Sequence, residues 1–422
     1  MLALLLGVMV FFLALNFPMV IPMVAAPLAV MIGYMPKMNI SMAVQQLIAG
    51  VSAQVLLAVP MFILAADIMC AGNTTRRLLD LVETFVGHIH GGMAITTAVT
   101  CTIFGAISGS TQATVVAIGK PMRQRLLKLG YSDSASSGLI ISSAIIALLI
   151  PPSISMIMYA VVTGSSVGDL FVAGVGPGIL ILIFFSIYSY FYAKFIKLPC
   201  LKKATWAERG KAFKKAIAPL GFPVIIFVGI YSGFFSPTEA AAVAVLYALI
   251  LELVVFRTIK LKDLHKIALS TAVVTCAVFI LVSGGQLFSW VISYAKIPQL
   301  LTTAILGATP SALKILVTVT IFFFIGCMFV DSLVVIIILS PIFFPLAMKA
   351  GINPIHLGIV ITLQAAIGSI SPPFGCNIFT GCAIFNRPYL DIVKGIPPYL
   401  IMLLVITVIV IVCPQLSLFL LN

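Results

Sequence analysis

Charged residues are scarce in this sequence. Asp, Glu, Lys and Arg together make up 8% of its 422 residues, whereas hydrophobic residues make up 62% and the mean hydropathy is +1.24. A soluble domain has about 25% charged residues. Apolar runs of about 18 residues or more recur along the chain, and such a run crosses a ~30 Å hydrocarbon layer as a helix. The sequence therefore predicts a protein embedded in a lipid bilayer.

Several other patterns are missing. Segments that alternate apolar and polar residues are absent, which favours a helical bundle over a membrane β-barrel. The eight cysteines show no CxxC or Cys/His metal spacing and are interpreted as small packing residues. HExxH, GxSxG and paired GxGD motifs are also missing, so an intramembrane aspartyl protease using Asp67 and Asp331 is a minor alternative. The prediction is an all-α polytopic membrane protein that is not an enzyme.

Positive charge exceeds negative charge, with 24 Lys and Arg against 11 Asp and Glu. The basic residues flank apolar runs, so we interpret them as determinants of membrane topology and not as a nucleic-acid surface. With the most basic segment, 194–215, in the cytoplasm, 20 of the 24 fall on the inner side. The first 36 residues contain no Lys or Arg, so residues 1–15 are expected to remain as a first helix and not as a cleaved signal peptide. This arrangement places the N-terminus in the periplasm.

The apolar segments predict two similar halves, 1–193 and 216–422, joined by a basic cytoplasmic linker over 194–215. Full spans are expected at about 1–15, 18–35, 54–71, 170–193, 217–234, 238–256, 270–294 and 392–418. Re-entrant hairpins are expected at about 92–119 and 311–348. Two further spans, about 132–162 and 355–384, are broken at Pro151-Pro152 and Pro372-Pro373. Each half then has five spans and one hairpin.

An internal repeat supports this division. At an offset of 221 residues, Gly105, Lys128, Gly130, Pro151, Pro152, Gly174 and Pro177 match Gly326, Lys349, Gly351, Pro372, Pro373, Gly395 and Pro398. Because five spans is an odd number, the second half is inverted relative to the first, and the two hairpins enter from opposite faces. Inverted repeats with helices broken at matching places indicate a transport site near the bilayer midplane.

The proline pairs are expected to expose backbone oxygen atoms. Proline has no N–H and disturbs the carbonyl four residues earlier, so the carbonyls of Ala147, Leu148, Gly368 and Ser369 are expected to be free. Residues that precede proline leave the α conformation, which places Ile150 and Ser371 in unwound turns. Unwound carbonyls suit Na⁺. An ordinary proline kink whose backbone groups pair with neighbouring residues is the alternative.

The two hairpin tips carry polar residues. Ser108, Gly109, Ser110 and Thr111 combine backbone freedom with hydroxyl groups that cap a helix. The matching tip carries Asp331, an acid between apolar runs, which is a functional candidate inside a membrane or a helix cap. Helix N-termini at both tips favour an anionic group. Ser153 and Ser155, just past the first break, are expected to face the same site.

Two acids outside the hairpins are expected to have structural roles. Asp67 lies within a long apolar span, where capping or ion pairing is a simpler explanation than substrate contact. Glu239 follows Ser236 with the spacing of a capping box.

Five stretches resemble the large membrane subunit of tripartite ATP-independent periplasmic (TRAP) transporters. They are FGAISGSTQATVVAIGKPM (104–122), LIPPSISMIMYAVVTG (149–164), GFFSPTEAAAVAVLYAL (233–249), SPIFFPLAMKAGINPIHLGIV (340–360) and SPPFGCNIF (371–379). The resemblance implies a sodium-driven elevator transporter in a bacterial inner membrane. It also implies two partners: a small membrane subunit of about four helices and a periplasmic substrate-binding protein. Among the branches, the chain is most similar to the sialic-acid type.

The resemblance also implies ion and substrate sites for two or more Na⁺ ions and an organic anion. The residues expected at the sodium sites are Ser108, Ser110, Ala147, Ile150, Pro152, Gly326, Asp331, Gly368, Ser371 and Phe374. The residues expected near the substrate are Ser108, Ser110, Ser155 and Asp331. A self-sufficient sodium/dicarboxylate carrier without a binding protein, and a membrane scaffold without transport, remain as alternatives.

Overall fold

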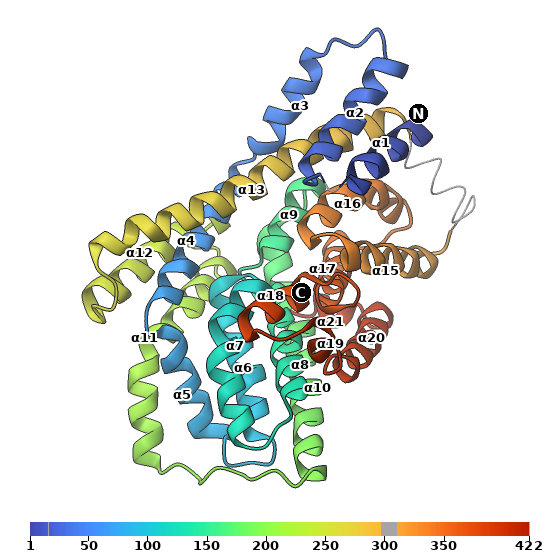
Figure 1. The fold of residues 1–422 in the computed structure, drawn as a ribbon. Coiled ribbons are helices and arrows are strands. Elements are labelled where there is room, and N and C mark those ends of the chain that lie inside the picture. Colours follow the sequence, from blue (N-terminus) through green and yellow to red (C-terminus); the bar gives the residue numbers. More distant parts are fainter. Residues whose placement is uncertain (16, 297–309, 422) are drawn as a thin grey trace.

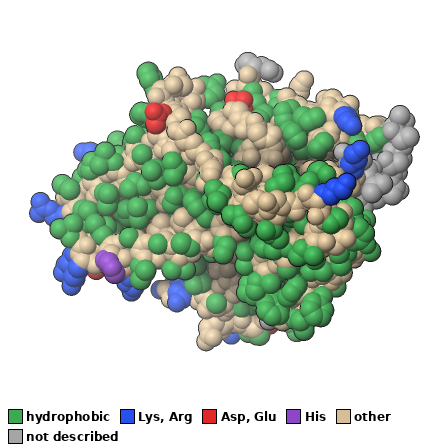
Figure 2. Space-filling model, turned by 90° about the horizontal axis from the view of Figure 1, so that it is seen from above, with side chains coloured by type: hydrophobic (Ala, Val, Ile, Leu, Met, Phe, Trp, Pro, Cys, Tyr) green, Lys and Arg blue, Asp and Glu red, His purple; other side chains and the backbone are tan. Residues whose placement is uncertain are grey.

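The computed structural model describes residues 1–15, 17–296 and 310–421, and in these ranges every regular element is a helix (Figure 1). Seven of the described helical segments are long and apolar enough to cross a membrane. Figure 2 shows hydrophobic side chains spread across one face, with Lys and Arg at its left, lower and right margins. This distribution fits a polytopic membrane protein, because the apolar face matches hydrocarbon and the charges lie toward water.

The first half opens with helices that agree closely with the predicted spans. They are α1 (Leu2–Ala14), α2 (Val20–Tyr34), α3 (Ser41–Val51), η1 (Gln54–Leu57), α4 (Ala58–Ala71) and α5 (Thr74–Val86). The helix α5 has one apolar and one charged face, and Leu78, Leu79 and Val82 are buried. Such an amphipathic helix suits the surface of a bilayer.

The first hairpin and the first broken helix follow. Their elements are α6 (Gly92–Ser108), α7 (Thr111–Lys128), α8 (Asp133–Ala144), η2 (Ile145–Leu148), α9 (Ile154–Thr163) and α10 (Val167–Phe195). The hairpin extends beyond the predicted range 92–119, because α7 continues to Lys128 although Pro121 lies inside it. The break at Pro151-Pro152 lies where the sequence predicted it.

In the described part of the second half, a hairpin is again followed by a broken helix. The elements of this half are α11 (Trp206–Tyr231), α12 (Pro237–Leu249), η3 (Ile250–Val255), α13 (Leu261–Tyr294), α15 (Ala312–Phe329), α16 (Ser332–Lys349), α17 (Pro354–Ile370), α18 (Cys376–Phe385), α19 (Tyr389–Val393), α20 (Pro397–Val412) and α21 (Gln415–Leu418). The hairpin α15–α16 and the broken pair α17–α18 match α6–α7 and α8–α9. The direction from which each hairpin enters a bilayer stays a prediction.

The linker is shorter than the predicted range 194–215. The helix α11 begins at Trp206, because Thr205 and Glu208 form a capping box in which each side chain bonds the other residue's N–H. The side chain of Arg209 then lies over the rings of Trp206 and Phe85, and its Nε donates to the Thr84 carbonyl at 3.2 Å. The predicted linker therefore ends in the first turns of a helix that packs on α5.

Three ionised groups join the basic end of the hairpin to the second half. Asp133, at the start of α8, pairs with Arg123 of α7 and with Arg387, each at 2.6 Å. The hydrogen bond from Arg123, together with the positive charge of both guanidinium groups, lowers the pKa of Asp133. This cluster ties α7, α8 and the segment after α18 into one unit.

The lowered pKa of Asp133 predicts a pH-dependent contribution to stability. A depressed folded-state pKa stabilises the protein above the unfolded-state value of 3.8, and that stabilisation is lost as the pH falls through the folded-state value. Thermal unfolding in detergent should show Asp133→Asn less stable than the native protein from about pH 7 to about pH 5. The difference should shrink toward about pH 3. Asp169→Asn, an exposed acid at the start of α10, is the control, and a difference independent of pH would contradict the prediction.

Candidate functional site

The first hairpin tip is formed by a turn between two helices. Gly109 has a φ of 59°, a left-handed conformation that favours glycine. Ser110 then caps α7 by accepting the N–H of Ala113 at 3.4 Å. The hydroxyls of Ser108 and Thr114 lie 3.0 Å apart, and Thr114 also donates to the Ser110 carbonyl at 2.8 Å. The tip is therefore held by its own hydrogen bonds.

The second hairpin tip has an acid where the first has a serine. The carboxylate of Asp331 accepts the N–H of Leu333 at 2.9 Å and caps α16. Ser332 donates to the carbonyl of Ala365 in α17 at 3.0 Å and holds the tip against the second broken helix. Capping uses Asp331 Oδ1, so the helix-cap interpretation is confirmed.

The first break interrupts the hydrogen bonding between α8 and α9. The N–H groups of Leu149 and Ile150 both donate to the Ile146 carbonyl at 3.0 Å. Pro151 and Pro152, joined by a cis peptide bond, supply no N–H to the carbonyls of Ala147 and Leu148.

Beyond the prolines, the chain turns back into a helix. Ser153 caps α9 by accepting the N–H of Met156 at 3.4 Å. The break thus ends in a helix N-terminus whose first turn contains Ser155.

The second break is more fully hydrogen-bonded than predicted. The carbonyl of Gly368 accepts the N–H of Ser371 at 3.1 Å, so the expectation that it is free is wrong. The Ser371 hydroxyl donates to the Ile367 carbonyl at 2.8 Å, and the Ser371 carbonyl accepts the N–H of Gly375 at 3.0 Å. The turn therefore pairs its own backbone groups. The carbonyl oxygens of Gly368 and Ser371 each have a second lone pair that can accept another hydrogen bond or a cation.

Both hairpin tips and both breaks meet at one small cavity of about 80 Å³. Its lining residues come from four separate segments of the chain: Gly109, Ser110, Thr111, Gln112, Leu148, Ile154, Ser155, Asp331, Ser332, Leu333 and Cys376. Three of the four predicted substrate residues, Ser110, Ser155 and Asp331, are therefore neighbours. Ser155 is 1% exposed, and its hydroxyl has no hydrogen-bond partner among the described residues. A buried hydroxyl without a partner is a place for a ligand or water.

The remaining predicted residues lie around this cavity and do not line it. The Ser108 side chain is directed to Thr114 and to the Ser110 backbone. Six further residues were predicted to bind sodium in or next to a hairpin or a break: Ala147, Ile150, Pro152, Gly326, Gly368 and Ser371. The carbonyl of Gly326 accepts the N–H of Val330 at 3.0 Å. Phe374 contacts Phe329, with ring centroids 5.8 Å apart. Their assignment to sodium sites stays a prediction.

The sequence reasoning missed a polar link between the two halves. The Thr111 hydroxyl at the first tip donates to Asn377 Oδ1 in α18 at 2.8 Å, and both side chains are buried. The Asn377 amide nitrogen has no partner in the described part of the chain. A buried asparagine within an apolar run is the signal that could have identified it, since polar residues inside membranes are costly and are retained for function.

Replacing Thr111 with valine should remove this link and leave the Asn377 oxygen with only the weak Cys376 thiol contact at 4.0 Å. The cost of an unsatisfied buried acceptor is about 1–3 kcal/mol, so we expect lower thermal stability in detergent and slower uptake. Thr362→Val is the matched control, because Thr362 is equally buried but its hydroxyl donates only to Gly358 of its own helix. Equal thermal stability and equal uptake of the two variants would show that the bond between Thr111 and Asn377 contributes to neither.

The other two acids considered from the sequence have structural partners. Asp67 of α4 accepts a hydrogen bond from Thr271 of α13 at 2.7 Å. Glu239 forms the predicted capping box, accepting the N–H of Ser236 at 2.8 Å. Asp67 lies apart from the cavity at the hairpin tips.

Two helical hairpins and two proline-broken helices meet at this small cavity, in a chain whose described regular elements are all helices. Residues 6–416 match the family model for the tripartite ATP-independent periplasmic transporter, DctM component. The chain belongs to this family of transporter large permease subunits and is not an enzyme.

Relatives named for ectoine transport are more similar to the chain than the sialic-acid relative. The ectoine TRAP transporter large permease of Halomonas elongata is 52% identical over 98% of this chain and 97% of its own length. The ectoine/5-hydroxyectoine large permease of Ruegeria pomeroyi is 52% identical over 98% and 96%. The sialic acid large permease of Vibrio cholerae is 34% identical over 90% of each chain. The expectation that the chain is most similar to the sialic-acid type is therefore wrong.

A solved structure has a similar fold. The YdaH transporter of Alcanivorax borkumensis superposes with a TM-score of 0.63 at 15% identity and covers 88% of this chain and 87% of its own. At this identity the likeness concerns the fold.

Proposed function

We propose that the chain is the translocating subunit of a sodium-coupled importer for a small organic acid of the ectoine type. The observation that carries the proposal is the cavity in which Asp331 of one hairpin faces Ser110 of the other and Ser155 of the first broken helix. A small membrane subunit and a periplasmic substrate-binding protein, with which TRAP large permeases work, complete the transporter.

Ectoine suits the polarity of this cavity. It is a small cyclic molecule that carries a carboxylate and a protonated amidine at neutral pH. The hydroxyls and the first N–H groups of α7 and α9 favour the carboxylate, since helix N-termini carry partial positive charge. The Asp331 carboxylate favours the amidinium, because the two charges are opposite and an N–H of the amidinium can donate a charge-assisted hydrogen bond. The 52% identity to two ectoine permeases agrees with this choice.

Sodium coupling is supported by the oxygen atoms around the cavity. Hard cations take backbone carbonyl and hydroxyl oxygens, and unwound helices in membrane transporters supply them. The carbonyls of Ala147 and Leu148, deprived of helical donors by Pro151 and Pro152, are the strongest candidates. The elevator movement of the two hairpins against the remaining helices belongs to the same proposal.

Uptake into proteoliposomes tests the proposed function. The chain would be reconstituted with its small subunit, with and without the cognate binding protein and an inward Na⁺ gradient. We expect ectoine uptake only when both are present, with sialic acid and a C4-dicarboxylate as comparison substrates. Uptake without the binding protein would instead support the self-sufficient carrier. Preference for sialic acid or the dicarboxylate would contradict the substrate class.

A further inference from the structure

Glu252 is a buried acid that has no part in the proposed function. It lies in η3 with 0% of its surface exposed, and no other Asp or Glu of the described chain is as deeply buried. It forms no ion pair within the residues that the structure describes. A carboxylate removed from water is unfavourable unless it is well hydrogen-bonded, and an acid within a membrane protein is a functional candidate.

The Glu252 carboxylate fills the corner between α4 and α5. Its Oε1 accepts the Thr74 hydroxyl at 2.6 Å, and its Oε2 accepts the hydroxyl of Thr258, which follows η3. At Gly72, between the two helices, an added Cβ would overlap this carboxylate. Asn73, the N-cap of α5, makes no side-chain bond to the helix. Glu252 therefore places a negative charge at the start of α5 from a different helix, and helix N-termini favour such a charge.

A second contact holds the first turn of α5. The segment η3 is a π-helix, in which the N–H of Phe256 donates to the Leu251 carbonyl at 2.8 Å. The guanidinium carbon of Arg77 lies 3.4 Å from the centroid of the Phe256 ring, and Arg77 Nη1 donates to the Lys215 carbonyl of α11 at 3.3 Å. Thr74 and Arg77 are three residues apart and therefore neighbours on the surface of α5. The start of α5 is thus fixed to η3 and α11, which belong to the second half.

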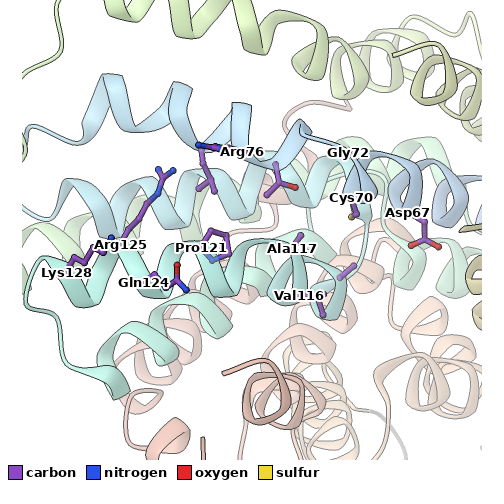
Figure 3. A pocket seen from close by; sticks show the side chains of 13 residues that line it. Asp67, Cys70, Gly72, Arg76, Val116, Ala117, Pro121, Gln124, Arg125 and Lys128 are labelled. Atoms are coloured by element: carbon purple, nitrogen blue, oxygen red, sulfur yellow. The ribbon is translucent and has the colours of Figure 1, made fainter. Parts of the chain in front are cut away.

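Further along α5, two acids reach the first hairpin. Asp80 and Glu83 pair with Arg125 of α7, Asp80 at 3.0 Å, and the three side chains are partly exposed. A cavity of about 790 Å³ lies between α4–α5 and α7, and Figure 3 shows Arg76 on one side of it and Arg125 and Lys128 on the other. The two acids lie about 9–14 Å along the helix from its first residue. Their position against α7 therefore depends on how the start of α5 is held.

We propose that Glu252 is a positioning residue for transport: by fixing the start of α5, it places the two acids of this helix against Arg125 of the first hairpin. Glu252 does not line the tip cavity and acts through Thr74 and α5. Hydrogen bonds to a buried carboxylate are charge-assisted and strong, whereas partly exposed ion pairs are weak and easily broken. The hairpin can therefore leave α5 during transport while α5 stays in place. This inference rests on the proposed function and adds a residue that acts on the hairpin from a distance.

Hydrogen exchange tests the hold on α5 without any substrate. Glu252→Gln removes the charge and keeps the side-chain size, and Thr74→Val is a milder second variant that removes one donor. In detergent, the amides of residues 74–79 should exchange about tenfold faster in either variant, since a hydrogen bond to a charged group is lost or weakened. Glu239→Gln, the same change at an exposed acid that caps its own helix, should leave this exchange at the native rate. Native exchange in α5 of both test variants would overturn the proposal.

A double-mutant cycle tests the link from the start of α5 to the hairpin. Thr74→Val and Arg125→Gln should each lower the maximal rate of ectoine uptake by about two- to fivefold, the loss expected for a partly exposed ion pair. The KM should stay at the native value, because the tip cavity is unchanged. The double variant should be no slower than the slower single variant, since Thr74 acts through the contact of Arg125. Changes at separated sites normally add, so multiplied losses would overturn the proposal.

Thr84→Val is the matched control for Thr74→Val. It removes another hydroxyl of α5, but one that donates only to Leu81 of the same helix, at 2.7 Å. This variant should show native uptake and native exchange at residues 74–79. Losses equal to those of Thr74→Val would show that any weakening of α5 has the same effect, and would overturn the role of Glu252.

Thermal unfolding separates this inference from the proposed function. The same cycle of Thr74→Val and Arg125→Gln, followed by unfolding temperature in detergent, reports the coupling without a substrate. If the chain transports none of the organic acids while the losses in unfolding temperature are non-additive, the proposed function fails and the hold of Glu252 on α5 and Arg125 stands. Additive losses would overturn that hold, whatever the chain transports.

Discussion

Replacing Asp331 with asparagine is expected to lower ectoine uptake by roughly 10- to 100-fold, the equivalent of losing a hydrogen bond to a charged group worth about 1.5–3 kcal/mol. Asparagine caps helices as well as aspartate does, so the Leu333 N–H keeps its acceptor and the fold should survive. The substitution therefore removes the negative charge from the cavity and little else. The measurement is initial uptake in proteoliposomes, with thermal unfolding in detergent as the check on folding.

Glu239→Gln provides the matched control for this charge removal. It also converts an acid to its amide, and it keeps the capping box because glutamine serves at that position. Glu239 caps α12 and does not line the tip cavity, so its uptake should equal that of the native protein. Native uptake by Asp331→Asn, or an equal loss in both variants, would show that the charge at the second tip is not a substrate contact.

Replacing Gly109 with alanine is expected to abolish uptake. The left-handed conformation costs a non-glycine residue roughly 1–2 kcal/mol, and the added Cβ would also collide with the carbonyl oxygen of Pro152. Only displacement of the first tip from the first break would relieve this collision. The hydroxyl groups of the first tip would then no longer lie beside the unwound carbonyls of the first break. Substrate binding and sodium binding should therefore be lost together.

Gly164→Ala is the control that introduces unfavourable backbone conformation without a steric collision. Gly164 ends α9 with a φ of 72°, and a Cβ there would meet no atom within 4 Å. This variant should lose a similar amount of conformational stability, measured by thermal unfolding, yet retain uptake. If Gly109→Ala transports as well as Gly164→Ala does, close contact between the tip and the break is not required for function.

The hairpins and breaks could be predicted because their causes are local. The pairs Pro151-Pro152 and Pro372-Pro373 each interrupt a helix, whereas the single Pro121 does not end α7. Gly109 with its serines forms a turn and a cap within a few residues. The limits of α6, α15 and α18 accordingly fall within a few residues of their predicted positions. The start of α11 was misplaced because strong positive charge suggested a linker, while a local capping box determined a helix.

The hydrogen bonding of the second break could not be predicted in the same way. Proline chemistry indicates which N–H groups are missing but not which other donors replace them. In the folded chain the N–H of Ser371 reaches the Gly368 carbonyl and that of Gly375 reaches Ser371. The bond between Thr111 and Asn377 joins residues 266 positions apart, and no local pattern indicates such a pairing.

The membrane class, the hairpin followed by a broken helix in each half, and the polar residues at the tips could be predicted from the residues alone, because hydropathy, proline and glycine act within short segments. The meeting of Ser110, Ser155 and Asp331 at one cavity, and the second cavity lined by α7, Arg76 and Lys128, are visible only in the folded chain. These arrangements depend on packing between helices from both halves, which hydrophobic contact and shape determine over distances that no short segment encodes.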